Sequence, residues 1–251
     1  MPDQAMPVMG HLAELRRRVF ICLIALIAGI AVSFGFYKQI IHVLERAGGH
    51  PQLYVFTLTG AIGPVMKISL LGGFILSLPV WVYEFVAFIA PGLTRTERRF
   101  LFMLLPGVTF SFAGGVAFAY FVLVPPMVKF LLNFGNGIAT AQPSLQSYID
   151  TVTMLMFWMG IAFETPFLMY FLALIGVVKP AFYARFRKYW FVIAFILGAV
   201  ITPTFDPVNQ TLVAGPFIVL YEIGIWLSRL AVRRPRQKTA AQPTRSASGL
   251  T

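Results

Sequence analysis

The sequence is poor in cysteine and histidine, and each shortage excludes a class of site. Its single cysteine, Cys22, cannot form an intramolecular disulfide, and no Cys-x-x-Cys or Cys/His set offers a metal site. The three histidines, His11, His42 and His50, lie at the ends of apolar segments or between them. No HExxH, Ser/Lys pair or paired-aspartate motif stands at matching depth in those segments. Neither catalysis, nor a metal ion, nor a cofactor is therefore expected.

Charge is also scarce. Charged residues make up only 12% of the 251 residues, whereas hydrophobic residues make up 58% and the mean hydropathy is +0.79. A soluble globular chain has roughly 45–50% apolar and about 25% charged residues. The composition therefore predicts an integral membrane protein that contacts the lipid bilayer. A net charge of +11 would suggest nucleic-acid binding in a soluble protein, but here the basic residues must first be assigned to one side of a membrane.

Six apolar segments could cross a bilayer, a task that needs about 20 mostly apolar residues. They are residues 19–37, 65–90, 100–124, 149–178, 189–201 and 208–227. The predicted fold class is an all-α integral membrane protein with six transmembrane helices. The fifth segment is about 20 Å long at 1.5 Å per residue, less than a hydrocarbon core of about 30 Å. The fifth and sixth helices are therefore expected to form a short hairpin whose turn, residues 202–207, lies below the membrane surface.

The chain is predicted to have three parts. Residues 1–18 form an N-terminal segment, residues 19–228 the six-helix domain, and residues 229–251 a basic tail whose polar composition predicts disorder. The connections 38–64 and 125–148 are rich in glycine and proline and are expected to fold over as caps.

The basic residues predict the orientation. Sixteen of the 20 Lys and Arg residues fall on one side if the spans alternate in direction, and only Lys38, Arg46, Lys67 and Lys129 fall on the other. Basic residues are enriched in cytoplasmic loops, so both termini are predicted to be cytoplasmic. This asymmetry accounts for most of the positive charge without nucleic acid.

Glu164 is the acid that the predicted spans place deepest in the bilayer. Ionisable groups inside a membrane are costly and indicate function by default. Glu164 must be protonated, exposed to a watery concavity, or paired with a polar group from another span. Glu84 and Glu222 lie near the ends of spans, where interfacial hydrogen bonding explains them. Pro166 follows Glu164 and is expected to kink its helix.

Asp206 lies in the turn between the fifth and sixth segments. As an N-cap of the sixth helix, with Pro207 in the first helical position, it has a specific structural explanation. Gln210 lies four residues further on and shares a helical face with it. A functional role for this polar turn stays open beside the capping role.

Glu14 and Glu97 are acids on the strongly basic side. Glu14 can pair with Arg17 or Arg18 on its own helix, and Thr94 with Glu97 has the spacing of a capping box. Two carboxylates on this side would also suit a ligand with paired arginines, because the planar guanidinium binds carboxylates in a fork. Both interpretations remain open from the residues alone.

Five stretches of the sequence occur in the order of a known family. They are HLAELRRRVF (11–20), FIAPGLTRTERR (88–99), FVLVPPMVKFLLNF (121–134), GIAFETPF (160–167) and ITPTFDPVNQTL (201–212). With these motifs the chain resembles the TatC family, the core component of the twin-arginine protein translocase. The resemblance covers about residues 10–230.

The resemblance implies a concave, glove-like wall of six helices in the bacterial inner membrane. It implies a receptor for twin-arginine signal peptides of folded cargo. Its implied partners are TatA- and TatB-type single-span proteins and further copies of itself, with transport driven by the proton-motive force. The family's signal-binding residues fall on Glu14, Leu15, Arg16, Phe88 and Glu97. Its partner-helix and intramembrane polar positions fall on Glu164, Thr202, Asp206 and Gln210.

Another class of protein remains as an alternative. A proton-coupled secondary transporter of small solutes could use Glu164 as its proton carrier. No internal repeat is visible in the sequence, and such transporters are commonly built from repeats. The translocase interpretation is therefore preferred.

Overall fold

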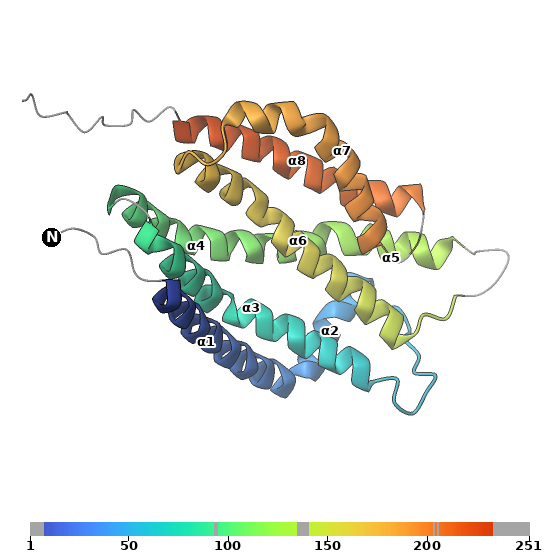
Figure 1. Cartoon of the computed structure of the whole chain (residues 1–251). Coiled ribbons are helices and arrows are strands. Elements are labelled where there is room, and N and C mark those ends of the chain that lie inside the picture. The colour runs from blue at the N-terminus through green and yellow to red at the C-terminus, as the bar shows by residue number, and fades with distance from the viewer. Residues whose placement is uncertain (1–7, 93–94, 135–140, 203, 205, 233–251) are drawn as a thin grey trace, which may run out of the picture.

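The computed structural model describes residues 8–92, 95–134, 141–202, 204 and 206–232, and this part of the chain is helical (Figure 1). The helices are α1 (Val8–Gly35), α2 (Tyr37–Ala47), α3 (Ile62–Ile89), η1 (Ala90–Gly92), α4 (Arg95–Phe118), η2 (Ala119–Leu123), α5 (Val124–Asn133), α6 (Leu145–Leu174), α7 (Pro180–Ile201) and α8 (Pro207–Val232). The described ranges contain no strand, only an isolated bridge between Tyr54 and Ser144. The predicted all-α class is confirmed.

Five helical segments are long and apolar enough to cross a membrane. They are Leu12–Gly35, Ile62–Ile89, Leu101–Asn133, Leu145–Leu174 and Pro207–Val232. The sixth crossing helix is α7, whose 22 residues begin with turns that carry Arg185, Arg187 and Lys188. Its apolar part is therefore as short as predicted, although the helix itself is longer. Helix α8 has 26 residues and is also longer than its predicted apolar segment.

The connections predicted as caps are partly helical. Residues 37–47 form α2, and α4 continues through the π-helical turn η2 into α5. Both connections therefore begin with helical residues. Pro125 and Pro126, which lack a backbone N–H, lie at the start of α5 directly after this π-helical turn.

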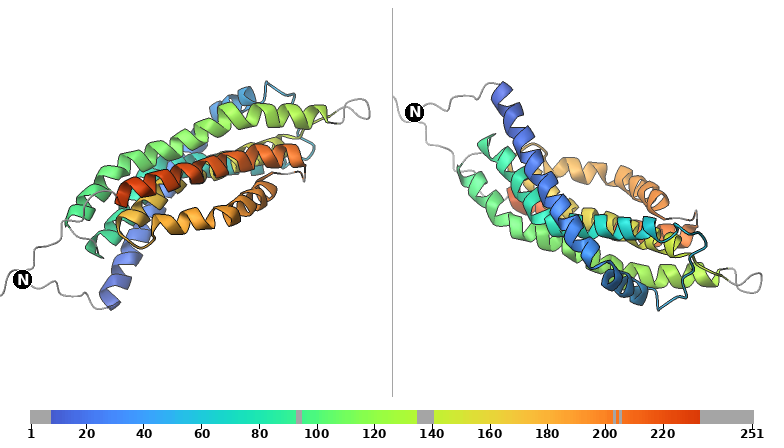
Figure 2. Two further views of the ribbon diagram at one scale, coloured as in Figure 1. Left: turned by 90° about the horizontal axis from the view of Figure 1, so that it is seen from above. Right: turned by 90° about the horizontal axis from the view of Figure 1, so that it is seen from below.

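The helices form an open arrangement rather than a closed ring. Helix α1 packs along α3, α6 lies at the centre against α3, α4 and α8, and α7 packs mainly against α8 (Figure 1). Figure 1 shows α1 and α7 at opposite edges of the arrangement, and the two views in Figure 2 show α1 crossing the other helices obliquely. The largest group of buried side chains surrounds α6 and includes Ile149, Val152, Leu155, Met159 and Ala162.

The two ends of the molecule differ in charge. At one end lie the start of α1, the end of α3, the start of α4, the α6–α7 turn and the end of α8 (Figure 1, left). We call this end the basic face, because Arg16, Arg17, Arg18 and the basic residues of α7 lie on these helix ends. The opposite end, the far face, carries α2, the start of α3 and the start of α6.

Candidate functional site

A cluster of three charged side chains joins α1 to α3 on the basic face. Arg18 donates to Glu14 Oε1 through Nε at 3.0 Å and through Nη2 at 2.6 Å. Its Nη1 donates to Glu84 Oε2 at 2.8 Å. The side chain of Glu84 is only 10% exposed, and those of Glu14 and Arg18 are each 23% exposed. One guanidinium therefore holds two carboxylates at the edge of the membrane domain.

The local sequence explains half of this cluster. Glu14 and Arg18 are four residues apart in α1, which places them on one helical face. Glu84 comes from the last turns of α3 and reaches Arg18 because the two helices pack closely. The pairing explains how a carboxylate can be buried at this position, because an unpaired buried charge is strongly destabilising. The sequence singled out Glu14, but it gave no signal that Arg18 bridges to Glu84.

The other predicted signal-binding residues lie on α1, α3 and α4. Leu15 and Arg16 follow Glu14 in α1, and both are exposed. Phe88 lies one turn after Glu84 in α3 and is half-buried. Glu97 lies in the first turn of α4, but its side chain is outside the described residues, as is Thr94. The distance between Glu14 and Glu97 is therefore not part of the described geometry.

Glu164 lies far inside α6. It is 10 residues before the end of the helix at Leu174, about 15 Å along the axis. Its Oε1 atom is buried and accepts no hydrogen bond within the described part of the chain. Ile161 and Leu168, at i−3 and i+4 on the same face, are 38% and 53% exposed. The partly buried carboxyl group thus lies beside apolar side chains that the described chain leaves exposed.

The polar residues of the α7–α8 turn bond to one another. Asp206 Oδ1 accepts from the Asn209 backbone N–H at 2.7 Å, and Oδ2 accepts from the Asn209 side chain at 3.0 Å and from the Thr204 hydroxyl. Thr202 Oγ1 donates to the Gly198 carbonyl at 2.9 Å, and Gln210 Nε2 donates to the Phe195 carbonyl at 2.9 Å. The predicted N-cap is confirmed, and these polar groups stabilise the hairpin.

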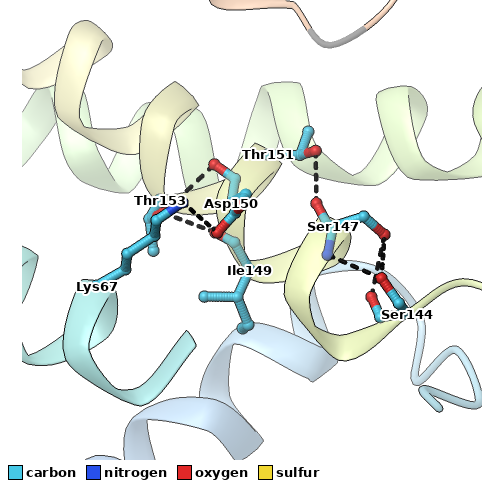
Figure 3. Close-up of polar contacts among 7 residues, drawn as sticks. All are labelled: Lys67, Ser144, Ser147, Ile149, Asp150, Thr151 and Thr153. Atoms are coloured by element: carbon cyan, nitrogen blue, oxygen red, sulfur yellow. Dashed lines mark hydrogen bonds and ion pairs between the residues drawn. The ribbon is translucent and has the colours of Figure 1, made fainter. Parts of the chain in front are cut away.

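Two further ion pairs connect helices that the sequence could not pair. On the far face, Lys67 Nζ of α3 lies 2.7 Å from Asp150 Oδ1 of α6 (Figure 3). On the basic face, Arg187 of α7 contacts Glu222 of α8 at 2.5 Å and 2.8 Å. In the described ranges, no group of three His, Cys, Asp or Glu side chains could hold a metal ion.

Comparison with known proteins gives one consistent family. The family model described as Sec-independent protein translocase protein (TatC) matches residues 10–216. A TatC protein of Aquifex aeolicus is 41% identical over 238 residues, which cover 92% of this chain and 98% of that protein. The chloroplastic TATC of Arabidopsis thaliana is 36% identical over 240 residues, 92% of this chain and 68% of that protein. A crystal structure of a twin-arginine translocase receptor, TatC, aligns with a TM-score of 0.79 at 41% identity, covering 89% of this chain and 100% of that one.

Proposed function

Because the chain belongs to the TatC family of Sec-independent protein translocase subunits, we propose that it is the core receptor of a twin-arginine translocase. The family is one of protein transport, so the chain is a multi-pass translocase subunit rather than an enzyme. In the proposed role it binds the signal peptides of folded cargo at the basic face. Glu14 and Glu97 receive the arginines, and Leu15, Arg16 and Phe88 border the bound peptide.

One observation supports this role most directly. The Glu14 carboxylate already accepts two hydrogen bonds from a guanidinium, at 2.6 Å and 3.0 Å. Its position and exposure therefore suit the group that a twin-arginine peptide would present. Arginine is favoured over lysine in such a contact, because the planar fork donates two N–H groups in fixed directions whereas an ammonium acts as a point charge.

The remaining parts of the proposal follow from the charge asymmetry and the family. We place the basic face in the cytoplasm of a bacterial inner membrane, because basic loops remain cytoplasmic. TatA- and TatB-type single-span proteins and further copies of this chain are the proposed partners, with transport driven by the proton-motive force. Glu164 is the proposed contact for a partner helix, with Thr202, Asp206 and Gln210 at the far end of the same wall. The solute-transporter alternative is not favoured by the family assignment.

The proposal is tested by peptide binding to the purified full chain in lipid nanodiscs. A labelled twin-arginine peptide should bind at least about tenfold more tightly than its twin-lysine version, the worth of one charge-assisted hydrogen bond. The Glu14→Gln/Glu97→Gln variant should lose this preference. Glu222→Gln is the matched control, because Glu222 is an acid of the basic face that pairs with Arg187, away from the cluster on α1 and α3. Equal binding of both peptides by the unmodified chain would contradict the receptor role.

A further inference from the structure

The Glu14 carboxylate is occupied by a residue of the same chain. Arg18 uses Nε and Nη2 on Glu14 and Nη1 on Glu84, so different parts of one guanidinium serve the two acids. We propose that Arg18 is the resident occupant of the docking carboxylate, and that a signal-peptide arginine replaces it on Glu14 while Arg18 remains on Glu84. This inference rests on the proposed function, and it adds a residue that sets the affinity of the site.

The contacts favour an exchange of arginines on Glu14 over a complete release of Arg18 from both acids. An incoming guanidinium can take over the two N–H donations that Glu14 now receives from Arg18, so Glu14 gains and loses equivalent bonds. Arg18 meanwhile keeps its 2.8 Å hydrogen bond to Glu84. Glu84 is 8% exposed as a residue, and without Arg18 it would be a buried carboxylate with no cation among the described residues. Glu84 therefore holds Arg18 close to the site in both states.

Resident occupancy lowers the affinity for every cationic ligand by the same factor. The apparent dissociation constant is the intrinsic constant divided by the fraction of molecules whose Glu14 is available. A weak basic peptide then fails to bind, whereas a peptide with two arginines retains useful affinity. Binding also stays reversible, as a receptor that must pass on its cargo requires.

The neighbouring arginine provides a matched control. Arg17 is exposed and its side chain makes no ion pair or hydrogen bond with any residue that the structure describes, whereas Arg18 is partly buried between two acids. Arg17→Gln removes one positive charge from the same turn of α1, whereas Arg18→Gln/Glu84→Gln leaves the net charge unchanged. A general effect of the basic field would therefore favour cationic peptides more in Arg17→Gln, so tighter binding by the Arg18 variant reports the contact with Glu14.

The experiment measures binding of the twin-arginine and twin-lysine peptides to full-length variants in nanodiscs. Arg18→Gln/Glu84→Gln removes the occupant together with its buried partner, so no charge is left at position 84, and the 23% exposed Glu14 loses its contact with Arg18. We expect both peptides to bind about fivefold more tightly, the worth of a partly buried ion pair. Arg17→Gln should change affinity by less than about twofold. Glu84→Gln alone should weaken binding, because a displaced Arg18 then has no second acid.

Arg18→Lys is a second variant, for use if Arg18→Gln/Glu84→Gln does not fold. It keeps the charge but offers a single ammonium for two carboxylates, and it should tighten peptide binding by a smaller factor. The inference is overturned if the Arg18 variants bind no more tightly than Arg17→Gln, or if Glu84→Gln has the same effect with and without Arg18. If either result is found while the unmodified chain still prefers the twin-arginine peptide through Glu14, the receptor role remains supported. Loss of that preference in the unmodified chain would instead overturn the proposed function.

Discussion

The hydrogen bonds of the α7–α8 turn determine the charge state of Asp206. Partial burial acts to raise the pKa of its carboxyl group, but hydrogen bonds from the Asn209 backbone, the Thr204 hydroxyl and the Asn209 side chain outweigh burial and hold the pKa below its ordinary value. A group with a lowered pKa in the folded state stabilises the fold when it is ionised. That contribution is present above the ordinary carboxyl pKa of about 3.9 and is lost as the pH falls through the lowered value.

Replacement of Asp206 tests this sign. We expect Asp206→Ala to lower the stability of the protein in detergent by about 1 kcal/mol at pH 7, the typical worth of a helix N-cap. The difference from the unmodified chain, followed by thermal unfolding, should shrink as the pH falls below about 4, because the unfolded chain then binds a proton at this carboxyl group more readily than the native chain does. Asp206→Asn, whose amide oxygen can still cap α8, is the control. A gap that stays constant down to pH 3 would mean that the charge contributes nothing.

The pairing of α1 with α3 depends on two glycines. A Cβ atom on Gly29 would lie 2.6 Å from the carbonyl oxygen of Gly73, and a Cβ on Gly73 would lie 2.6 Å from the backbone N of Ile30. The two backbones therefore touch where they cross. Small residues at such crossings allow close helix packing in membranes, where the hydrophobic effect does not drive helices together. This crossing sets the spacing at which Arg18 meets Glu84.

A larger residue at Gly29 should separate the two helices. We expect Gly29→Val to destabilise the fold by about 1–3 kcal/mol, the usual cost of overpacking, and to weaken the Arg18–Glu84 contact. Thermal unfolding in detergent should show the loss. Gly114→Ala in α4 is the control, because a Cβ built there has no atom within 4 Å beyond its own stretch of helix. If both variants unfold at the same temperature as the unmodified chain, the close approach is not needed.

For the molecule as a whole, hydropathy predicted the membrane-spanning segments but did not determine where each helix begins and ends. Long apolar runs have few alternatives to a membrane helix, because every backbone polar group must be satisfied within the segment. Helices α2 and α5 were missed because each follows a span directly and lacks an apolar run of spanning length. The i,i+4 pair of Glu14 and Arg18 was predictable, whereas the bridge to Glu84 joins residues 66 positions apart and depends on the α1–α3 crossing.

Glu164 is the residue at which we expect a partner helix to contact the chain. Its buried Oε1 has no hydrogen-bond partner within the described residues, and Ile161 and Leu168 beside it are exposed. With lipid beside Ile161 and Leu168, the buried Oε1 atom keeps no hydrogen-bond partner from the described residues, which is costly inside a membrane. A partner helix with a polar side chain at the same depth would cover the apolar residues and donate to the carboxyl group. The face of α6 that carries Ile161 and Leu168 is therefore the place where we expect the single-span partner to pack.

Substitution of Glu164 should separate assembly from signal binding. We expect Glu164→Ala to reduce co-purification of the single-span partner from membranes by about fivefold or more, because an interhelical hydrogen bond in a membrane is worth about 1–2 kcal/mol. Glu164→Gln retains a polar group and should keep part of the association. Twin-arginine peptide binding should stay within about twofold for both variants, since Glu164 lies about 15 Å along α6 from the basic face. A parallel loss of partner and peptide binding would indicate a folding defect and remove the support for a partner contact at this residue.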